Sequence, residues 1–258
     1  MKEEAHVTIV VPNWNTGPLL RICLSSLRRF TQVPHQVIVV ENGSSDESLQ
    51  TAERAAEAGQ IELITRRDAK NEGAADHAAA LDAGLAAARG PLLMTLDSDA
   101  WARKPGWLQS YIDALGGGSH AGATKFPSGR LSTLWRQVRG KRRGPEWHYI
   151  RPCHALYRVS LLRELGLSFA PHQMPSGRWR TTGEHLHNRL VDEGHSPAFI
   201  PHARVSELVG HLYHATIVLN PTSFPGLRER ARRRGERRID RWLKSTEAKA
   251  ILEGSEFS

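Results

Sequence analysis

Two carboxylates separated by one residue are the side chains of this sequence best suited to hold a metal ion. Asp97, Ser98 and Asp99 directly follow the apolar segment 91–96, which has the pattern of a buried strand. Two carboxylates at this spacing can reach one divalent cation, or one can bind the cation and the other a hydroxyl group. Hard cations such as Mg²⁺ and Mn²⁺ prefer oxygen ligands and usually keep substrate phosphates in their coordination shell. Aspartate pairs in loops are often merely solvated, so the position of this pair in the fold decides between the two interpretations.

Strand and helix patterns alternate through the first hundred residues. Each predicted strand is a short β-branched or apolar run, and each predicted helix carries an apolar stripe or an alanine-rich sequence. This rhythm predicts an α/β fold with a mostly parallel central sheet and helices on both faces. Such sheets bind ligands at the carboxyl ends of their strands, which draws attention to residues 12–15, 41–46 and 97–99. The predicted strands span 7–11, 37–40, 61–65 and 91–96, and the predicted helices span 18–30, 73–89 and a segment after Ser44.

Four segments in this order resemble the nucleotide-sugar-binding half of the family 2 glycosyltransferases, which have the Rossmann-like GT-A fold. They are VTIVVPNWN at 7–15, VIVVENGSSD at 37–46, NEG at 71–73 and LDSD at 96–99. The resemblance covers residues 6–110 well and 150–216 more loosely. It implies a metal-dependent, inverting transfer of a sugar from a nucleoside diphosphate sugar, with a UDP-sugar favoured, to an acceptor hydroxyl. It also implies Mn²⁺ or Mg²⁺ as the cofactor.

The resemblance assigns roles to individual residues of the first half. Pro12 and Asn15 match the loop that lines the base pocket, and Glu41 stands where the family commonly has an aspartate that contacts uracil or ribose. Asn71 and Gly73 match a segment whose backbone passes close to the donor. In the DXD motif, Asp97 and Ser98 are expected to contact the donor and Asp99 to bind the metal. His211 is the candidate that completes the metal site, with a structural role as the alternative.

The catalytic base is expected at the start of a helix in the second half. Family members often have a Glu-Asp pair there, and the second carboxylate commonly serves as the base. This sequence has Glu184 followed by His185. We expect Glu184 to take over the role, and His185 remains an alternative because a histidine pKa near 6.5 suits proton abstraction at neutral pH. Glu184 could also simply stabilise the helix N-terminus.

Positive charge is concentrated in two segments. Lys and Arg number 35 against 27 Asp and Glu, which gives a formal net charge of +8. Residues 128–151 hold seven basic residues and one acid, and residues 228–244, a predicted basic amphipathic helix, hold nine and three. We expect a glycan or lipid-linked glycan as the acceptor, with the basic segments docking on an anionic membrane surface. A glycosyltransferase that acts on modified bases of DNA is the alternative, and a basic helix that is merely solvated is the simpler explanation of the charge. The candidate contacts are Lys141, Arg142, Arg143, Arg232, Arg233 and Arg234.

Several protein classes are excluded or made less favourable. The two cysteines exclude a disulfide framework and a thiolate-rich metal cluster. The sequence has neither a Gly-x-Ser-x-Gly nor a Walker motif, so a serine-hydrolase elbow and a P-loop nucleotide triphosphatase are not indicated. No apolar run approaches the roughly 20 residues of a membrane span, and no secretory signal is recognised, so we expect a cytoplasmic enzyme, with peripheral membrane association as one reading. A non-catalytic nucleotide-sugar or nucleic-acid binding module is the remaining alternative.

The expected organisation is one GT-A domain with an appended helix. Residues 1–115 form the nucleotide-sugar-binding half, 116–220 the acceptor-binding and catalytic half, 221–252 the basic C-terminal helix and 253–258 a tail. Four tryptophans could form sugar-stacking faces or belong to the core. They are Trp101, Trp107, Trp135 and Trp147.

Overall fold

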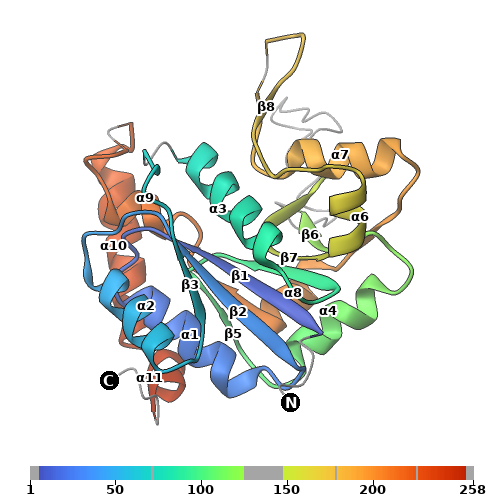
Figure 1. Ribbon diagram of the computed structural model, residues 1–258. Coiled ribbons are helices and arrows are strands. Elements are labelled where there is room, and N and C mark those ends of the chain that lie inside the picture. Colours follow the sequence, from blue (N-terminus) through green and yellow to red (C-terminus); the bar gives the residue numbers. More distant parts are fainter. Residues whose placement is uncertain (1–5, 71–72, 125–147, 178, 225, 254–258) are drawn as a thin grey trace.

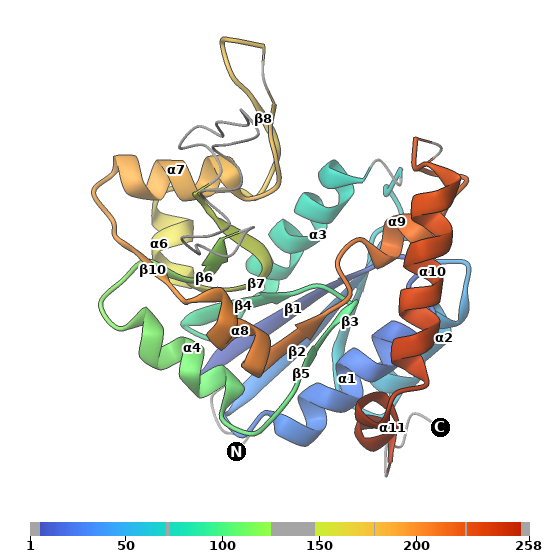
Figure 2. The same ribbon diagram turned by 180° about the vertical axis from the view of Figure 1, so that it is seen from behind.

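A seven-stranded sheet with helices on both faces forms the centre of the protein (Figures 1 and 2). The computed structural model describes residues 6–70, 73–124, 148–177, 179–224 and 226–253. The strand order is β10-β6-β7-β4-β1-β2-β3. The strands are β1 (Val7–Asn13), β2 (His35–Glu41), β3 (Glu62–Thr65), β4 (Leu92–Leu96), β6 (His120–Thr124), β7 (Ile150–Arg158) and β10 (Pro197–Phe199).

The predicted α/β fold is confirmed, and its first half follows the predicted order. β1 pairs in parallel with both β2 and β4, and β2 pairs in parallel with β3. β7 is inserted between β4 and β6 and runs antiparallel to both. The central sheet therefore joins strands from both sides of residue 115. The helices are α1 (Pro18–Phe30), α2 (Glu47–Glu57), α3 (Ala74–Ala87), α4 (Trp107–Leu115), α6 (Val159–Glu164), α7 (Glu184–Asp192), α8 (His202–Leu208), α9 (Ala215–Leu219), α10 (Glu229–Leu243) and α11 (Thr246–Leu252).

Alternate residues of the central strands supply two separate cores, because successive side chains of a strand point to opposite faces. Ile9 and Val11 of β1 pack with apolar residues of α1, α2, α4 and α8. Val10, between them, packs with α3, α6 and α7 on the other face. α3 lies so close to β1 that a Cβ at Gly84 would be 2.3 Å from a methyl carbon of Val10.

A smaller unit built around β5 (Ala100–Ala102) connects the sheet to the C-terminal helices. β5 pairs antiparallel with β11 (Val209–His211). The Trp101 ring lies 3.8 Å from the Trp242 ring, centroid to centroid, and its Nε1 donates to Glu247 Oε1 at 2.9 Å. Trp101 and Trp107 are both buried in cores. For these two residues the prediction of a sugar-stacking face is wrong, and the alternative of a place in the core is confirmed. Trp135 and Trp147 lie outside the described residues.

The single basic helix predicted over 221–252 is wrong, because the structure has two helices there, α10 and α11, and Ser245 caps the start of α11. α10 carries the basic residues, and only a narrow strip of it is packed against the rest of the protein. Gly235 and Ile239 are its buried residues, and a Cβ at Gly235 would meet a methyl carbon of Val218 at 2.5 Å. Ala231 of the same helix is exposed. Among the helices of the described segments, none has both the length and the apolar character that crossing a membrane requires. The remaining short strands, β8 (His172–Gln173) and β9 (Trp179–Arg180), pair antiparallel beside α7.

Candidate functional site

The two aspartates of the DXD motif leave the sheet at the carboxyl end of β4. The backbone N–H of Asp97 donates to Cys153 O on β7 at 2.9 Å, and Ala100 N–H donates back to Asp97 O at 2.9 Å. This tight turn leads from β4 directly into β5 and fixes the backbone of the motif. Asp99 is 6% exposed, whereas the side chain of Asp97 is 25% exposed. One carboxylate therefore faces the interior and the other remains open to a ligand.

His211 comes from far along the chain to meet both aspartates. The pairing of β11 with β5 places His211 opposite Ala100, the residue after Asp99. Its Nε2 lies 2.8 Å from Asp99 Oδ1 and 3.6 Å from Asp97 Oδ2. One ligand atom from each of the three residues lies within 4.8 Å of the others. The structure thus brings together the two predicted carboxylates and the predicted histidine.

The second oxygen of each carboxylate is held by another group. His77 Nε2 lies 3.0 Å from Asp97 Oδ1, and the N–H of Ala215 donates to Asp99 Oδ2 at 3.1 Å. These contacts orient the remaining oxygens, Asp97 Oδ2 and Asp99 Oδ1, toward His211. The sequence analysis missed His77. Its only signal was a histidine in the alanine-rich first turn of a helix that follows the Asn-Glu-Gly segment.

The charges in this cluster compensate one another. Burial alone would lower the pKa of His211, but Asp99 beside it raises that pKa well above its usual value. Burial alone would raise the pKa of Asp99, and His211 holds it below its usual value instead. Burial alone would also lower the pKa of His77, but the charge of Asp97 and the contact with it raise that pKa above its usual value. At neutral pH a protonated His211 therefore supplies the positive charge between the two carboxylates.

The atoms that converge in this cluster are suitable ligands for a hard divalent cation. Two carboxylate oxygens and one imidazole nitrogen converge, and Mn²⁺ and Mg²⁺ accept such ligands. The cation would replace the proton on His211 as the positive charge that faces Asp97 and Asp99. Second partners that orient ligating groups, as His77 and Ala215 do here, are typical of metal sites. Asp97, Asp99 and His211 are therefore the residues that could hold Mn²⁺ or Mg²⁺.

The loops after β1 and β2 are joined by buried polar contacts. Glu41 is fully buried, and its two oxygens accept from Asn13 Nδ2 at 2.5 Å and from Ser44 N at 2.6 Å. Asn15 has a positive φ of 47°, and its Oδ1 accepts from Ser45 N at 2.7 Å. Glu41 thus orders this edge of the sheet through internal hydrogen bonds. Asn13, a buried hub of the network, was not singled out from the sequence.

Pro12 and Gly73 lie at the same end of the parallel strands. Pro12 belongs to β1 itself, opposite Val40 of β2, rather than to the following loop. Gly73 has a φ of 66° and forms the N-cap of α3. Ser98, between the two aspartates, is buried. Asn71 lies outside the described residues.

The start of α7 is tied to the start of α3. Thr182 Oγ1 donates to Ala74 O at 3.1 Å, which places the first turn of α7 beside the predicted donor segment. Glu184 is 3% exposed, and its Oε2 accepts from Thr181 N at 3.1 Å. This contact satisfies a backbone donor just before the helix. Glu184 therefore holds the turn that precedes α7, beside the start of α3, and it is not the side-chain cap of the helix, whose N-cap residue is Gly183.

His185 is more open and belongs to a basic surrounding. Its ring stacks on His172 with a centroid distance of 4.2 Å, and its Nδ1 lies 3.1 Å from Arg180 NH1. Burial, followed by the charges of His172 and Arg180, lowers the pKa of His185. His185 is therefore neutral at pH 7. Arg180 can only donate, so it occupies the Nδ1 lone pair, and His185 would have to release Arg180 before it accepts a proton at this atom.

The residues predicted to contact an anion differ in whether their positive charge is already paired with a glutamate. Arg232 pairs with Glu229 at 2.7 Å and with Glu236, and Arg233 pairs with Glu229 at 2.6 Å. Arg234 is exposed on α10. Much of the charge of Arg232 and Arg233 is thus balanced within the helix. Lys141, Arg142 and Arg143 lie outside the described residues.

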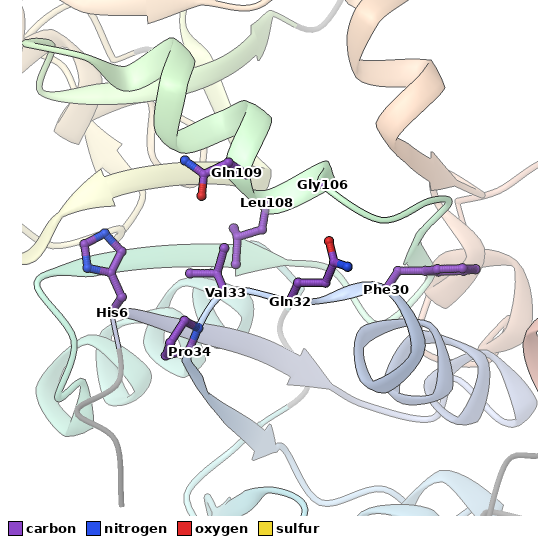
Figure 3. Close-up of a pocket in the computed structure, with 8 residues that line it drawn as sticks. All are labelled: His6, Phe30, Gln32, Val33, Pro34, Gly106, Leu108 and Gln109. Carbon is purple, nitrogen blue, oxygen red and sulfur yellow. The ribbon is translucent and has the colours of Figure 1, made fainter.

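A cavity of about 720 Å³ lies at the other end of the sheet (Figure 3). His6 and Pro34 line it, and they directly precede β1 and β2. The cavity is therefore at the amino ends of these strands, away from the DXD motif. None of the residues that line it belongs to the Asp97, Asp99 and His211 cluster.

Comparison with known proteins identifies the family. The family model "Glycosyl transferase family 2" matches residues 8–166, more than half of the chain. "Putative glycosyltransferase EpsH" of Bacillus subtilis (strain 168) is 30% identical over 114 residues, which cover 44% of this chain and only 31% of EpsH. Mannosyltransferase PcManGT from Pyrobaculum calidifontis, solved in complex with GDP-Man and Mn²⁺, is 17% identical with a TM-score of 0.56, covering 98% of this chain and 80% of that chain. Glucosyl-3-phosphoglycerate synthase from Mycobacterium tuberculosis, solved with Mn²⁺, UDP and phosphoglyceric acid, is 20% identical with a TM-score of 0.50, covering 76% and 67%. The chain belongs to glycosyl transferase family 2 and has the GT-A fold.

Proposed function

We propose that this protein is a metal-dependent, inverting glycosyltransferase that moves a sugar from a nucleoside diphosphate sugar to an acceptor hydroxyl. The observation that carries the proposal is the convergence of Asp97, Asp99 and His211 at the carboxyl ends of the central strands. A UDP-sugar is the favoured donor, and Mn²⁺ or Mg²⁺ is the favoured cation. Complexes with UDP or GDP-Man and with Mn²⁺ are known for two structural relatives, which supports this choice.

The proposed site uses two neighbouring parts of the chain. Asp97, Asp99 and His211 would hold the cation, which when bound supplies positive charge that stabilises the leaving diphosphate. Pro12, Asn15 and Glu41 would shape the base and ribose pocket, and Gly73 would let the backbone approach the donor closely. The N-terminus of α3, with its partial positive charge, suits a phosphate group there.

Glu184 is the proposed general base. It would take the proton from the acceptor hydroxyl while that oxygen attacks the anomeric carbon from the face opposite the diphosphate. Glu184 lies in the first turn of α7, which Thr182 ties to the start of α3. His185 is the alternative base, because it is neutral at pH 7 and more exposed.

The proposed acceptor is a glycan or lipid-linked glycan with an anionic character. Residues 1–115 would bind the donor, residues 116–220 the acceptor, and α10 an anionic part of the acceptor or a membrane surface. Arg234 and the other exposed arginines of α10 support this assignment. Arg232 and Arg233, which are already paired with glutamates, support it less.

Release of nucleoside diphosphate tests the proposal. The purified chain is incubated with a panel of nucleotide sugars, with Mn²⁺ or with EDTA, and with lipid-linked glycan or duplex DNA as acceptor. Metal-dependent release from a UDP-sugar, stimulated by the glycan, is expected. Release that EDTA leaves unchanged would contradict the metal role, and stimulation by DNA alone would contradict the acceptor.

Two matched variants test the base. Glu184→Gln keeps the size of the side chain and should lower the transfer rate by at least 100-fold with little change in donor affinity. His185→Gln serves as the control and should change the rate by less than tenfold. The opposite pattern would assign the base to His185.

A further inference from the structure

We propose a second metal site for a soft divalent cation, best filled by Zn²⁺, formed by Cys153, His154 and His211. One ligand atom from each of these residues lies within 4.8 Å of the others. The site shares His211 with the Asp97–Asp99 cluster, and its other two residues are buried, whereas the side chain of Asp97 is 25% exposed. Its ligand chemistry is different, because a thiolate and two imidazoles suit Zn²⁺ whereas two carboxylates suit Mn²⁺ or Mg²⁺.

The local backbone explains why two consecutive residues of a strand can serve one site. β7 keeps its register with β4 as far as His154, which lies opposite Leu96. Its register with β6 shifts between Gly122, opposite Ala155, and Thr124, opposite Ile150. β7 therefore carries extra residues between these points. Strict alternation of the side chains breaks down in such irregular segments, and Cys153 and His154 both come within reach of His211.

The buried nitrogen of His211 independently indicates a ligand. The side chain of His211 is only 5% exposed. Its Nδ1 is buried and has no nitrogen or oxygen partner among the described residues, and the Cys153 thiol is the group within hydrogen-bonding reach of this side chain. Its other nitrogen, Nε2, faces Asp99 Oδ1 at 2.8 Å. A thiol is a weak hydrogen-bond partner for a nitrogen at this depth, and a bond to a metal ion would satisfy both groups.

Asp99 would act as the partner that orients His211 in this state. Metal-bound histidines usually donate their other N–H to a carboxylate, which fixes the tautomer and the ring orientation. Here Nε2–H would donate to Asp99 and leave the Nδ1 lone pair for Zn²⁺. The hydroxyl of Tyr111, 3.3 Å from His154 Nδ1, supplies a similar contact for the second imidazole.

The spacing is close to that of a tetrahedral site. Zn–S and Zn–N bonds of about 2.0–2.3 Å place neighbouring ligand atoms about 3.5 Å apart, so ligand atoms that lie within 4.8 Å of one another need to close by no more than about 1.3 Å. Binding would form one Zn–S and two Zn–N bonds. It would release the proton of the Cys153 thiol and any proton on Nδ1 of His211, and water would take the fourth position.

Sharing of His211 makes the two sites antagonistic, and this part of the inference rests on the proposed function. When Nδ1 binds Zn²⁺, Nε2 keeps its hydrogen and has no lone pair for a cation between Asp97 and Asp99. Zn²⁺ would therefore weaken Mn²⁺ binding. The inner site would act as an inhibitory site for soft metals.

Cobalt spectroscopy tests the soft site without any assay of activity. The metal-free full-length chain is titrated with Co²⁺ under reducing conditions, and the thiolate-to-cobalt charge-transfer band in the near ultraviolet is recorded. One equivalent should produce the band, and Zn²⁺ but not Mg²⁺ should abolish it. No thiolate band in the wild-type chain would overturn the proposal.

The two cysteines allow a clean assignment. Cys23→Ala leaves Cys153 as the only thiol of the chain and should keep the band, whereas Cys153→Ser should lose it. A band that disappears in Cys23→Ala and persists in Cys153→Ser would overturn the proposal. His154→Gln keeps both thiols and should weaken Co²⁺ binding at least tenfold, so an unchanged affinity would also overturn it. Circular dichroism checks that each variant is folded, and Cys23→Ala alone remains decisive if Cys153→Ser does not fold.

A second titration separates this inference from the proposed function. Mn²⁺ binding is measured by electron paramagnetic resonance with and without one equivalent of Zn²⁺. At least a tenfold weakening by Zn²⁺ is expected. Equal Mn²⁺ binding in both states would overturn the antagonism. Absence of Mn²⁺ binding in both states would refute the proposed metal centre and the antagonism with it, while the cobalt band still decides the soft site.

Discussion

Acidification should destabilise this chain through one buried pair of histidines. His120 of β6 and His187 of α7 are 0% and 4% exposed, and His120 Nε2 lies 2.7 Å from His187 Nδ1. Only one hydrogen fits between these nitrogens, so a second proton would place two N–H groups against each other. Burial and the neighbouring His187 lower the pKa of His120 to about 3, and burial lowers the pKa of His187 to about 4.

The direction and size of the effect follow from linkage. Both values lie below the ordinary histidine pKa of 6.5, so the unfolded chain binds protons that the folded chain excludes. The stability is fully present above pH 6.5 and is lost as the pH falls toward the folded values. Each such proton gives a slope of about 1.4 kcal/mol per pH unit. Two histidines between pH 6.5 and 5 give about 4 kcal/mol at most, and we expect on the order of 2–4 kcal/mol because the two sites interact.

Urea unfolding at several pH values between 7.5 and 5 measures this loss. The double variant His120→Gln, His187→Gln cannot titrate there, so its midpoint should fall less on acidification than that of the wild type. His6→Gln, at an exposed position, is the control and should keep the wild-type slope. Parallel losses in the wild type and the double variant would refute the reasoning.

Three further predictions concern the candidate metal site and the packing of α3 on β1. Asp99→Asn should weaken Mn²⁺ binding by roughly 100-fold or more, because it removes a charged ligand; calorimetric titration that gives the wild-type affinity would contradict the metal site. His77→Phe should weaken Mn²⁺ binding by about 10–100-fold through the loss of the contact with Asp97, and His77→Gln, which can still donate, should recover part of it in the same titration. Gly84→Ala should cost about 1–3 kcal/mol in urea unfolding, because its Cβ would lie 2.3 Å from Val10, whereas Gly117→Ala, where a Cβ meets nothing within 4 Å, is the control that should be close to neutral.

The alternating strands and helices of the first half could be predicted because their signals are local. Pro18 at the first turn and the apolar stripe that follows define α1, and the structure gives the predicted limits. The place of β7 could not be predicted in the same way. Its antiparallel insertion between β4 and β6 depends on contacts with residues far away in the sequence, and a strand's own residues do not encode which neighbours it takes.

The residues of the candidate site likewise divide into those that a local sequence motif predicts and those that depend on contacts far apart in the sequence. Asp97 and Asp99 are recognisable from a motif of three residues at the end of a strand. Cys153 and His154 carried no signal, because their importance depends on an irregular pairing with β6 and on the approach of β11. The salt bridges of Arg232 were visible in principle, since Glu229 and Glu236 lie three and four residues away on one helix face.

The candidate metal site is completed by a part of the chain that lies beyond the family match. That match ends at residue 166, yet His211 supplies the third ligand atom. Its position depends on neighbours further along the chain: Leu212 N–H donates to Asp99 O at 3.0 Å, and Arg238 of α10 donates to Tyr213 O at 2.6 Å. The basic helix therefore has a structural task that needs no anionic partner. It holds the segment that carries His211 against the turn of the DXD motif, so a substitution of Arg238, which donates to Leu212 O and Tyr213 O, should affect the candidate metal site.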